Sequence, residues 1–597
     1  MDVLSANATK RDAKQYLSRF KRVKTPHTGK TEGANSSVEE PSILRRQQAS
    51  LDRLGVNLGG LYAPARAIAE TPVFERSEKL RQNTVPNQQA LHVAIVCLRA
   101  PQTLSDPVLD GVATTLSQLV KLDTRIVLVL ELGSEGTYMG AREQRKTLAA
   151  QAERLLAAIK KHSREASRFV TGALETTEKG STKLVLPQLI MEPLKRGVIP
   201  IVPGLAHTPS GQLTKVDVAD VMAALTEGIA GGKGAGHTEG RQADTEASID
   251  RIILLDAAGG VPSKVRSDNA HVFINLEQEY NDIQKELADY ETWADGISSP
   301  NMYDQHKANL RMLKRCLAML PSASSALIIS PHEAAASSQA TDAAEAAIGA
   351  GTRRQKNTLI HNLLTNKPMV SSSLPTARLT TTAGIAGEGA PAAPTAATLV
   401  KTGMPVAIIP AADRVDGWTA PPHGHSSFEL DRDPRVDFPR LVHLIEDSFR
   451  RRLNVKHYID RVRQRTAGLI VAGEYEGGAI FTWERPPASS TGQRLVPYLD
   501  KFAVLQTSQG SSGVADILFQ SMVRTCFPNG VCWRSRDNNP VNKWYFERAA
   551  GSWKIPGSGW TMFWTGEGVV DDKQRWQDYV GVCKSVVPSW ADGKRPD

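Results

Sequence analysis

Cysteine is scarce in this sequence, and the few cysteines are not arranged for bonding. The 597 residues include five cysteines, at Cys97, Cys316, Cys526, Cys532 and Cys583. They form no CxxC pair and no cluster with histidine, so neither a disulfide framework nor a metal site is predicted. Scattered thiols of this kind are typical of a protein that works in a reducing compartment.

A long hydrophobic run is also missing. No stretch reaches the roughly 18 apolar residues that a membrane-spanning helix needs, so no span is predicted. The composition, 41% hydrophobic and 23% charged, is that of a globular protein. At 597 residues the chain is too long for one core, and two or three domains are expected because domains usually run about 100–200 residues.

Acidic residues are scarce at the N-terminus, which holds much of the net charge of +9. Only Asp2 and Asp12 are acidic in the first 30 residues, whereas the basic residues are Lys10, Arg11, Lys14, Arg19, Lys21, Arg22, Lys24 and Lys30. A basic, hydroxyl-rich and acid-poor leader is typical of a mitochondrial transit peptide. A disordered basic tail or an RNA-binding arm is the alternative, although no basic-aromatic motif supports a nucleic-acid partner. Residues 1–88 are therefore predicted to be a transit peptide and disordered leader.

Short apolar runs recur from residue 92 onward and predict strands that are buried on both faces. They lie at 92–98, 125–132, 198–204, 251–256, 326–331 and 405–410. Helical patterns, such as those at 216–229 and 275–293, separate these runs. The alternation of strand and helix predicts an α/β fold with a largely parallel sheet. Two low-complexity stretches, 228–248 and 380–398, are predicted to be mobile surface insertions.

A change of composition at 411–434 predicts a linker between two domains. We expect one domain at 89–412, the linker at 413–436 and a second domain at 437–597. In the second domain, 440–453 has the apolar spacing of a helix. The segment 468–483 is predicted to be a hairpin that turns at Gly477 and Gly478.

A glycine-rich turn, QTSQGSSG, connects a strand at 498–505 to an amphipathic helix at 514–526. A helix N-terminus offers unpaired N–H groups and a positive dipole end, and glycines let an anion approach the backbone. This order of elements is therefore a candidate phosphate-binding device, although an ordinary connection has the same pattern. A nucleotide P-loop is not predicted, because no GK[ST] follows the glycines.

Four segments, YLDKFAVL, QGSSGVADILF, WRSRDNNPVNKWYFERAAGS and WTMFW, resemble the GNAT acetyltransferase domain of fungal mitochondrial N-acetylglutamate synthases. The upstream α/β region resembles the amino-acid-kinase domain fused to it in that family, so the resemblance covers most of the chain from about residue 90. It implies an amino-acid-kinase-like α/β sandwich followed by a GNAT fold. The implied reaction is direct transfer, in a ternary complex, of the acetyl group of acetyl-CoA to the α-amine of L-glutamate. This reaction opens arginine biosynthesis and uses no metal.

The resemblance also implies which residues form the site. Those expected to bind substrate are Tyr498, Lys501, Arg534, Asn539 and Asn542. Lys501 and Tyr545 are expected to be catalytic, with Tyr545 either protonating the leaving thiolate or binding a substrate carboxylate. Those expected to bind acetyl-CoA are Phe502, Val504, Gln509, Gly510, Ser511, Ser512, Gly513 and Ala515. Main-chain N–H groups at 502–505 would polarise the acetyl carbonyl. The general base stays open among Asp500, Glu547 and a water chain.

Two departures from the family pattern stand out. The turn from Gln509 to Gly513 and Ala515 is one residue longer than usual, which affects the choice of N–H groups for the pyrophosphate. The Lys-x-Gly-Gly loop of active amino-acid kinases is absent after the first strand, so phosphoryl transfer is not predicted. The family instead implies inhibition by L-arginine, homo-oligomers and a mitochondrial matrix location.

Other functions stay open from the sequence. The chain could be a regulatory or scaffold partner in complex with N-acetylglutamate kinase, or an acetyltransferase for another amine. The site residues also have structural alternatives: Lys501 could be a solvated strand residue, and Arg536 could pair with Asp537 or Glu547. Trp544 and Phe546 could be core residues.

Overall fold

The computed structural model describes residues 90–162, 167–178, 180–231, 247–263, 270–293, 301–335, 357–368, 397–413, 415–487, 494–509 and 513–591. The leader predicted at 1–88 lies outside these residues. So do most of the low-complexity stretches at 228–248 and 380–398. Predictions about these segments therefore stay predictions.

The first sheet has eight strands in the order β10-β12-β11-β9-β1-β2-β6-β3. Their bounds are β1 (Leu91–Arg99), β2 (Arg125–Glu131), β3 (Ser167–Phe169), β6 (Ile199–Pro203), β9 (Ala247–Leu255), β10 (Phe273–Asn275), β11 (Ser325–Ile329) and β12 (Thr398–Lys401). All neighbours pair in parallel except β11 with β12. The prediction of a largely parallel sheet is therefore confirmed.

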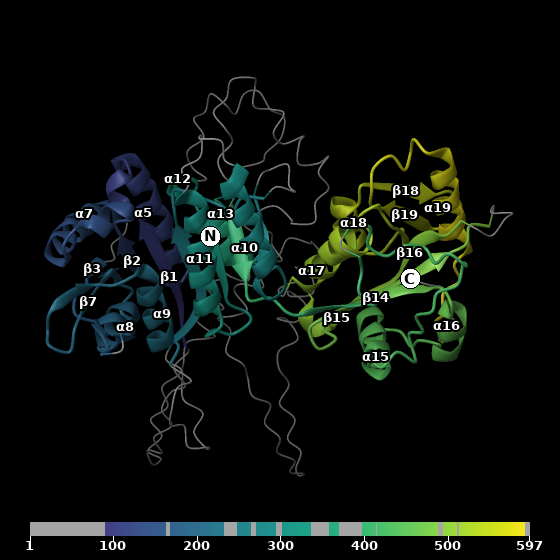
Figure 1. Cartoon of the computed structure of the whole chain (residues 1–597), viewed down its shortest axis with the longest axis horizontal. Helices are drawn as coiled ribbons and strands as arrows, with labels where there is room; N and C mark the ends of the chain where they lie inside the picture. Colours follow the sequence, from purple (N-terminus) through teal and green to yellow (C-terminus); the bar gives the residue numbers. More distant parts are fainter. Residues whose placement is uncertain are drawn as a thin grey trace, which may run out of the picture. The chain divides into compact units, whose positions relative to one another are not determined.

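Helices cover this sheet on both faces (Figure 1). They are α5 (Asp106–Lys121), α6 (Ser134–Tyr138), α7 (Ala141–His162), α8 (Gln188–Lys195), α9 (Val218–Ile229), α10 (Leu276–Trp293), α11 (Asn301–Leu317), α12 (Pro331–Ala335) and α13 (Thr358–Thr365). Alternate residues of β1, Val93, Ile95 and Cys97, share one core with residues of α9 and α11 such as Leu225 and Leu310. Burial on both faces explains why these strands read as continuous apolar runs.

A small four-stranded sheet, in the order β5-β4-β7-β8, accompanies the large one. Its strands are β4 (Leu174–Thr176), β5 (Thr182–Leu184), β7 (Leu205–His207) and β8 (Leu213–Lys215). Each has three residues, which is too short to show a periodic pattern in the sequence. No helix of the described residues is long and apolar enough to cross a membrane.

The second large sheet has seven strands in the order β13-β14-β15-β16-β17-β19-β18. Their bounds are β13 (Val406–Ile409), β14 (Thr466–Ala472), β15 (Gly477–Glu484), β16 (Val496–Val504), β17 (Cys532–Arg536), β18 (Gly551–Ile555) and β19 (Trp560–Trp564). All neighbours are antiparallel except β16 and β17. The run expected at 405–410 as the last strand of the first α/β layer forms β13, but β13 pairs with β14 and so belongs to this second sheet.

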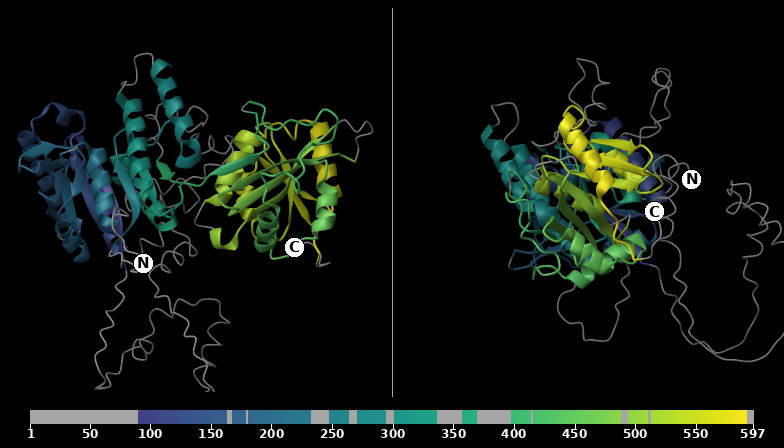
Figure 2. Two further views of the ribbon diagram at one scale, coloured as in Figure 1. Left: turned by 60° about the horizontal axis from the view of Figure 1, so that its bottom comes forward. Right: turned by 90° about the vertical axis from the view of Figure 1, so that its right-hand side faces the viewer.

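Two groups of helices cover the seven-stranded sheet (Figure 2). On one face lie α15 (Phe438–Phe449), α16 (Val455–Val462) and α19 (Lys573–Ser585); on the other lie α17 (Val514–Ser521) and α18 (Asn542–Arg548). Alternate strand residues divide between the faces: Val471 contributes to the core under α15, and Ile470 to the core under α17. A five-residue π-helix, Met522–Cys526, follows α17. The helix expected at 514–526 therefore changes its winding after Ser521.

The predicted turn of the β14–β15 hairpin is wrong. Gly477 and Gly478 lie inside β15, where they pair with Ala472 and Val471, and the chain turns at Gly473–Glu476 instead. The reason is close packing of α17, because a Cβ on Gly477 would lie 2.4 Å from Val514 Cγ1. The two glycines thus bring helix and sheet together rather than bend the chain.

Candidate active site

The central feature of the second sheet is a divergence of its two parallel strands. β16 and β17 pair only at Tyr498 and Cys532, after which both strands continue without pairing to each other. Helix α18 covers the divergence on one face, because Trp544 lies 5.7 Å from the Phe502 ring of β16 and Tyr545 lies 5.4 Å from the Trp533 ring of β17, centroid to centroid. The gap is therefore lined by residues from both strands.

A β-bulge in β16 places the residues beside this gap. Phe481 of β15 pairs with Leu499, whereas the preceding Ile480 pairs with Lys501, so Asp500 is the extra residue. A bulge breaks the alternation of side chains between the two faces. Asp500 and Lys501 consequently reach the same partners on the face covered by α15, α16 and α19, which we call the α16 face.

Lys501 is fixed at this bulge by an ion pair. Its Nζ lies 3.0 Å from Asp500 Oδ2, 5.1 Å from the centre of the Tyr458 ring and 5.6 Å from that of Trp590. Burial lowers the pKa of Lys501, and the Asp500 carboxylate opposes that effect. The alternative of a solvated strand lysine does not fit a side chain that is only 10% exposed.

Asp500 is a poor candidate for the general base. Burial would raise its pKa, but the charges of Arg461 and Lys501 outweigh burial and hold the pKa well below the usual range. A carboxyl group with a strongly lowered pKa is a weak proton acceptor at neutral pH. The other candidate, Glu547, has a side chain that is 66% exposed and pairs with Arg548 at 3.1 Å.

Tyr498 and Arg534 lie near Lys501 on the α16 face. Burial raises the pKa of Tyr498 well above its ordinary value, and the charge of Arg534 opposes this effect. The Arg534 guanidinium donates from Nη1 to the Cys583 carbonyl at 2.5 Å and from Nη2 to the Val586 carbonyl. These carbonyls are at the end of α19, where a cation is favoured by the helix dipole. Arg534 therefore has a structural role at α19 in addition to the expected one toward substrate.

Asn539 and Asn542 hold the loop between β17 and α18. Asn539 Nδ2 donates to Ser535 Oγ at 2.9 Å, and its Oδ1 accepts from the Val541 N–H at 3.0 Å. Asn542 Nδ2 donates to the Arg536 carbonyl at 2.6 Å. Among the described residues, Asn542 Oδ1 has no hydrogen-bond partner although it is enclosed. The structure thus shows both amides as loop-fixing groups, with one acceptor of Asn542 unused.

Tyr545 lies on the opposite face of the sheet from Lys501. Its ring contacts Trp533, Phe563 and Trp544, and burial raises the pKa of its hydroxyl. No described residue accepts or donates a hydrogen bond to this hydroxyl. A hydroxyl that stays protonated can donate a hydrogen bond, and α18, which carries it, covers the divergence of the strands.

The candidate phosphate turn is described only in part, because Gly510, Ser511 and Ser512 lie outside the described residues. Gly513 precedes α17 with φ +74°, a conformation that glycine adopts readily, and Ala515 lies in the first turn. Gln509 Nε2 donates to the Val504 carbonyl at 3.0 Å, which ties the turn to the end of β16. The binding of an anion at this helix end stays a prediction.

The N–H groups at 502–505, which are expected to polarise the acetyl carbonyl, differ in their hydrogen bonds. The N–H of Val504 donates to Ser448 Oγ of α15 at 3.1 Å, and the N–H of Leu505 donates to the Glu476 carbonyl at 2.9 Å. These two N–H groups already have partners, and because successive N–H groups of a strand alternate in direction, the N–H of Ala503 points toward β15 like that of Leu505. The N–H of Phe502 is left on the side of the gap, and the prediction that the N–H groups at 502–505 polarise the acetyl carbonyl stays a prediction.

Metal or thiol chemistry finds no support in the described residues. No group of three or more histidine, cysteine, aspartate and glutamate side chains could hold a metal ion there. All five cysteines are buried and unpaired. Burial raises the pKa of Cys97 to about 12 and that of Cys316 to about 11, which leaves both as inert thiols.

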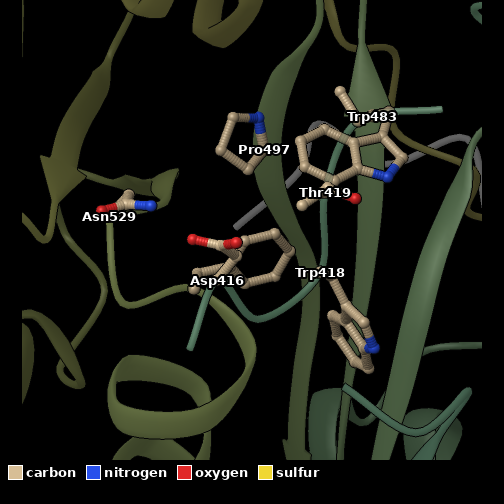
Figure 3. Close-up of a pocket in the computed structure, with 9 residues that line it drawn as sticks. Asp416, Trp418, Thr419, Trp483, Pro497 and Asn529 are labelled. Atoms are coloured by element: carbon tan, nitrogen blue, oxygen red, sulfur yellow. The ribbon is translucent and has the colours of Figure 1, made fainter. Parts of the chain in front are cut away.

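A separate hollow of about 260 Å³ lies near the start of β16 (Figure 3). Its apolar lining consists of Trp418, Trp483, Pro497 and Phe527, and Asp416 is at its rim. Pro497 is the second residue of β16, whereas the divergence begins beyond Tyr498. None of the expected site residues lines this hollow.

Sequence reasoning missed the partners of Asp500. Arg461 and Tyr458 of α16 both donate to its carboxylate, and neither residue has a motif that marks it. The one signal was Asp500 itself, because a carboxylate inside an apolar strand must find a cation or donors. That signal predicts a partner but does not say which residue supplies it.

Comparison with known proteins defines the class to which this fold and site belong. The family described as "NAT, N-acetyltransferase, of N-acetylglutamate synthase" matches residues 425–586, which include the divergent strands and α15 to α19. The C-terminal part is therefore an N-acetyltransferase domain of the GNAT type, and the predicted fold class is confirmed.

Relatives match nearly the whole chain. An amino-acid acetyltransferase, mitochondrial, of Aspergillus fumigatus is 42% identical over 99% of this chain and 89% of its own. The protein of the same name from Aspergillus terreus is 40% identical over 99% and 92%. This chain belongs to the mitochondrial amino-acid acetyltransferase family, as its sequence motifs predict, and is an N-acetyltransferase.

A solved structure shows a more distant likeness. N-acetylglutamate synthase from Neisseria gonorrhoeae, in complex with coenzyme A and N-acetyl-glutamate, aligns with 80% of this chain and 96% of its own. Its sequence identity is 12% and the TM-score is 0.40.

Proposed function

We propose that this chain transfers the acetyl group of acetyl-CoA to the α-amine of L-glutamate, giving N-acetyl-L-glutamate and CoA. The observation that carries the proposal is the gap between β16 and β17, with the Lys501 ammonium on one face and the Tyr545 hydroxyl on the other. The family description for residues 425–586 names N-acetylglutamate synthase, which favours glutamate as the acceptor.

The α16 face suits a substrate with two carboxylates. A lysine ammonium has three N–H donors. Lys501 Nζ donates to the Asp500 carboxylate at 3.0 Å and to the Asp500 carbonyl at 3.4 Å. A further donor is left for a substrate carboxylate. Arg534 adds positive charge and Tyr498 adds a hydroxyl, so an anion on this face meets complementary charge.

The chemistry we propose is a direct attack without a covalent enzyme intermediate. The neutral α-amine attacks the thioester carbonyl, a C–N bond forms and the C–S bond breaks. The attacking nitrogen loses its extra proton to water, and the hydroxyl of Tyr545 gives its proton to the leaving thiolate and regains one from solvent. The N–H group of Phe502 stabilises the charge that develops on oxygen. Orientation of the two substrates in the gap supplies much of the acceleration.

The pyrophosphate of acetyl-CoA would bind at the N-terminus of α17. The backbone at Gly513 and Ala515 would hold the pyrophosphate, because a helix N-terminus carries unpaired N–H groups and a positive dipole end. Arg548 pairs with Asp516 in the first turn of α17, which removes a negative charge that would repel the phosphates.

The proposal extends to location and control. The relatives are named mitochondrial, and with the basic leader this supports the mitochondrial matrix as the site of action. We propose two functional parts, as expected, but with the boundary before β13 and not at 412, because β13 belongs to the second sheet and the segment predicted as the linker, 413–436, contributes Trp418 and Phe428 to the cores of the second part. The first would bind L-arginine as a feedback inhibitor and form homo-oligomers, and a complex with N-acetylglutamate kinase is a further expectation.

The test is thiol release from acetyl-CoA by purified protein without residues 1–88, with L-glutamate, D-glutamate, L-glutamine and L-aspartate in separate reactions. We expect release that depends on L-glutamate and that L-arginine suppresses. Lys501→Met should raise KM for glutamate and lower kcat, whereas Lys543→Met, an exposed lysine of α18, should match wild type. Binding of acetyl-CoA without turnover on any amine would contradict the enzyme and favour a regulatory protein. Turnover on another amine alone would contradict glutamate.

A further inference from the structure

A buried charge network lies behind Lys501. The Asp500 carboxylate, 1% exposed, accepts from Tyr458 Oη and Lys501 Nζ, each at 3.0 Å, and from Arg461 Nη2. Arg461 also lies 3.5 Å from Glu484. We call Tyr458, Arg461, Glu484, Asp500 and Lys501 the Asp500 network. It joins α16 to the strand that borders the substrate gap.

Glu484, the member of the network farthest from Lys501, has a hydrogen-bond partner for each of its two oxygens. Glu484 Oε1 accepts from Thr482 Oγ1 at 2.8 Å, and Oε2 accepts from Arg465 Nη1 at 3.2 Å. Arg461 is thereby held between two carboxylates and lies 5.5 Å from the Tyr458 ring centre. Two nitrogens of the Arg461 guanidinium thus have carboxylate partners, whereas its enclosed Nε has none among the described residues.

Such an arrangement is costly for stability alone. Buried ion pairs are often no more stabilising than apolar residues of similar volume. The network however orders a side chain that would otherwise be mobile, because a free lysine retains considerable rotamer entropy. A lysine that is already ordered binds a carboxylate without that loss. The network is therefore better explained by what it does for Lys501 than by its own energy.

We propose that Arg461 and Tyr458 are positioning residues for acetyl transfer, because through Asp500 they hold the Lys501 ammonium on the α16 face. This inference rests on the proposed function and deepens it. Neither residue touches the gap itself: Tyr458 is fully buried in the core under α15 and α16, and the Arg461 side chain is 12% exposed.

The charges around Lys501 give the network a pH signature. Asp500 raises the pKa of Lys501, whereas Arg461 and Arg534 lower it. The other groups that face its ammonium are the rings of Tyr458 and Trp590. Removing the carboxylate or the guanidinium should therefore move the Lys501 pKa in opposite directions.

The experiment compares Tyr458→Phe, Arg461→Met and Asp500→Asn with wild type, and uses Arg463→Met as the control. Arg463 follows α16, is 40% exposed and pairs only loosely with Asp431 at 3.6 Å. We expect kcat/KM for glutamate to fall about tenfold in Tyr458→Phe, the effect of one hydrogen bond to a charged group. The value of kcat/KM for glutamate should fall further in Arg461→Met. In both variants KM for acetyl-CoA should stay within about twofold of wild type, because the network acts on the glutamate side.

The pH profile separates positioning from a structural role. The alkaline limb of kcat/KM for glutamate should move to lower pH in Asp500→Asn and to higher pH in Arg461→Met. The substrate amine titrates identically in all variants, so a difference between them belongs to the enzyme. Folded variants with wild-type profiles and wild-type kcat/KM would overturn the proposal.

A second readout needs no turnover. Competitive labelling of lysines with acetic anhydride, read by mass spectrometry, reports the reactivity and pKa of Lys501. We expect faster labelling of Lys501 in Asp500→Asn, where its pKa falls, and slower labelling in Arg461→Met, where its pKa rises, with unchanged labelling of Lys543. Equal labelling in every variant would overturn the positioning role. A wild-type enzyme that fails on glutamate would overturn the proposed function, while the labelling still decides the role of Arg461 and Tyr458.

Discussion

Arg548 Nη2 lies 2.8 Å from Asp516 Oδ1, so a guanidinium on α18 neutralises a carboxylate in the first turn of α17. Arg548 Nε also donates to the same oxygen at 2.9 Å, and the guanidinium lies 4.2 Å from the centre of the Trp544 ring. The helix that borders the candidate phosphate site is thus tied to the helix that carries Tyr545. Under the proposed mechanism, this pair links binding of acetyl-CoA to placement of the proton donor.

Replacing Arg548 should weaken binding of acetyl-CoA. In Arg548→Met, Asp516 loses the guanidinium that offsets its charge beside the proposed phosphate site, and we expect KM for acetyl-CoA to rise about tenfold. KM for glutamate should change less. The measurement is steady-state kinetics in both substrates, with the exposed Lys543→Met as control. An unchanged KM for acetyl-CoA in a folded Arg548→Met variant would contradict the placement of the pyrophosphate.

Gly477 should not tolerate a side chain. A Cβ there would lie 2.4 Å from Val514 Cγ1 and 2.9 Å from Leu518 Cδ1, and both side chains are buried and cannot move aside. Overpacking of this kind costs about 1–3 kcal/mol. We expect Gly477→Ala to lower the midpoint of thermal unfolding and to raise KM for acetyl-CoA, because α17 is displaced. Gly140→Ala, with no atom within 4 Å of the new Cβ, is the control and should leave both quantities unchanged.

The two interpretations of Tyr545 predict different kinetics. A proton donor to the thiolate acts after binding, so Tyr545→Phe should lower kcat by about 10²-fold, the usual size of general acid catalysis, with both KM values little changed. A carboxylate ligand would instead show a raised KM for glutamate. Because burial keeps the pKa of Tyr545 above its usual value, loss of its proton should not limit activity below pH 9. The matched control is Tyr579→Phe, which removes a hydroxyl bonded to Arg575 on the other face.

Stability of the N-terminal α/β part should fall at mildly acid pH because of His306. This histidine is fully buried in α11, and among the described residues neither ring nitrogen has a partner. Burial lowers its pKa from 6.5 to about 4, so the unfolded state binds the proton first. The stabilising contribution is complete above pH 6.5 and is lost as the pH falls toward 4.

The test is unfolding by urea between pH 4 and 7. A shift of this size corresponds to about 3 kcal/mol across that window, and His306→Leu should flatten the dependence. His332→Leu, an exposed histidine of α12, should retain it. An equally steep pH dependence in His306→Leu would show that other groups are responsible.

The strands of the first sheet were predictable because a strand that is buried on both faces has a continuous apolar sequence. β1, β2 and β9 follow that rule. The hairpin turn was not predictable, because a Gly477–Gly478 pair looks the same whether it bends the chain or admits a helix. The run at 405–410 was recognised as a strand, but a strand pattern does not name its neighbour, and β13 pairs with β14.

The candidate site residues come from sequence motifs and stay predictions, whereas their contacts come only from the structure. The motif around Arg534 implies a cation for substrate, yet only the structure shows that its guanidinium ends α19. The sequence likewise does not indicate that Arg461 pairs with Asp500, because the two residues are 39 positions apart and come into contact only in the folded chain. Long-range ion pairs of this kind depend on tertiary structure, which a single sequence does not display.

The most direct test of the central claim is identification of the product. The protein without its leader is incubated with acetyl-CoA labelled with ¹³C in the acetyl group and an equimolar mixture of the twenty amino acids, and the products are separated by mass spectrometry. The account predicts one dominant labelled product, N-acetyl-L-glutamate, which disappears in Lys501→Met and persists in Lys543→Met. A dominant labelled product from another amine, or no labelled product although the protein binds acetyl-CoA, would contradict it.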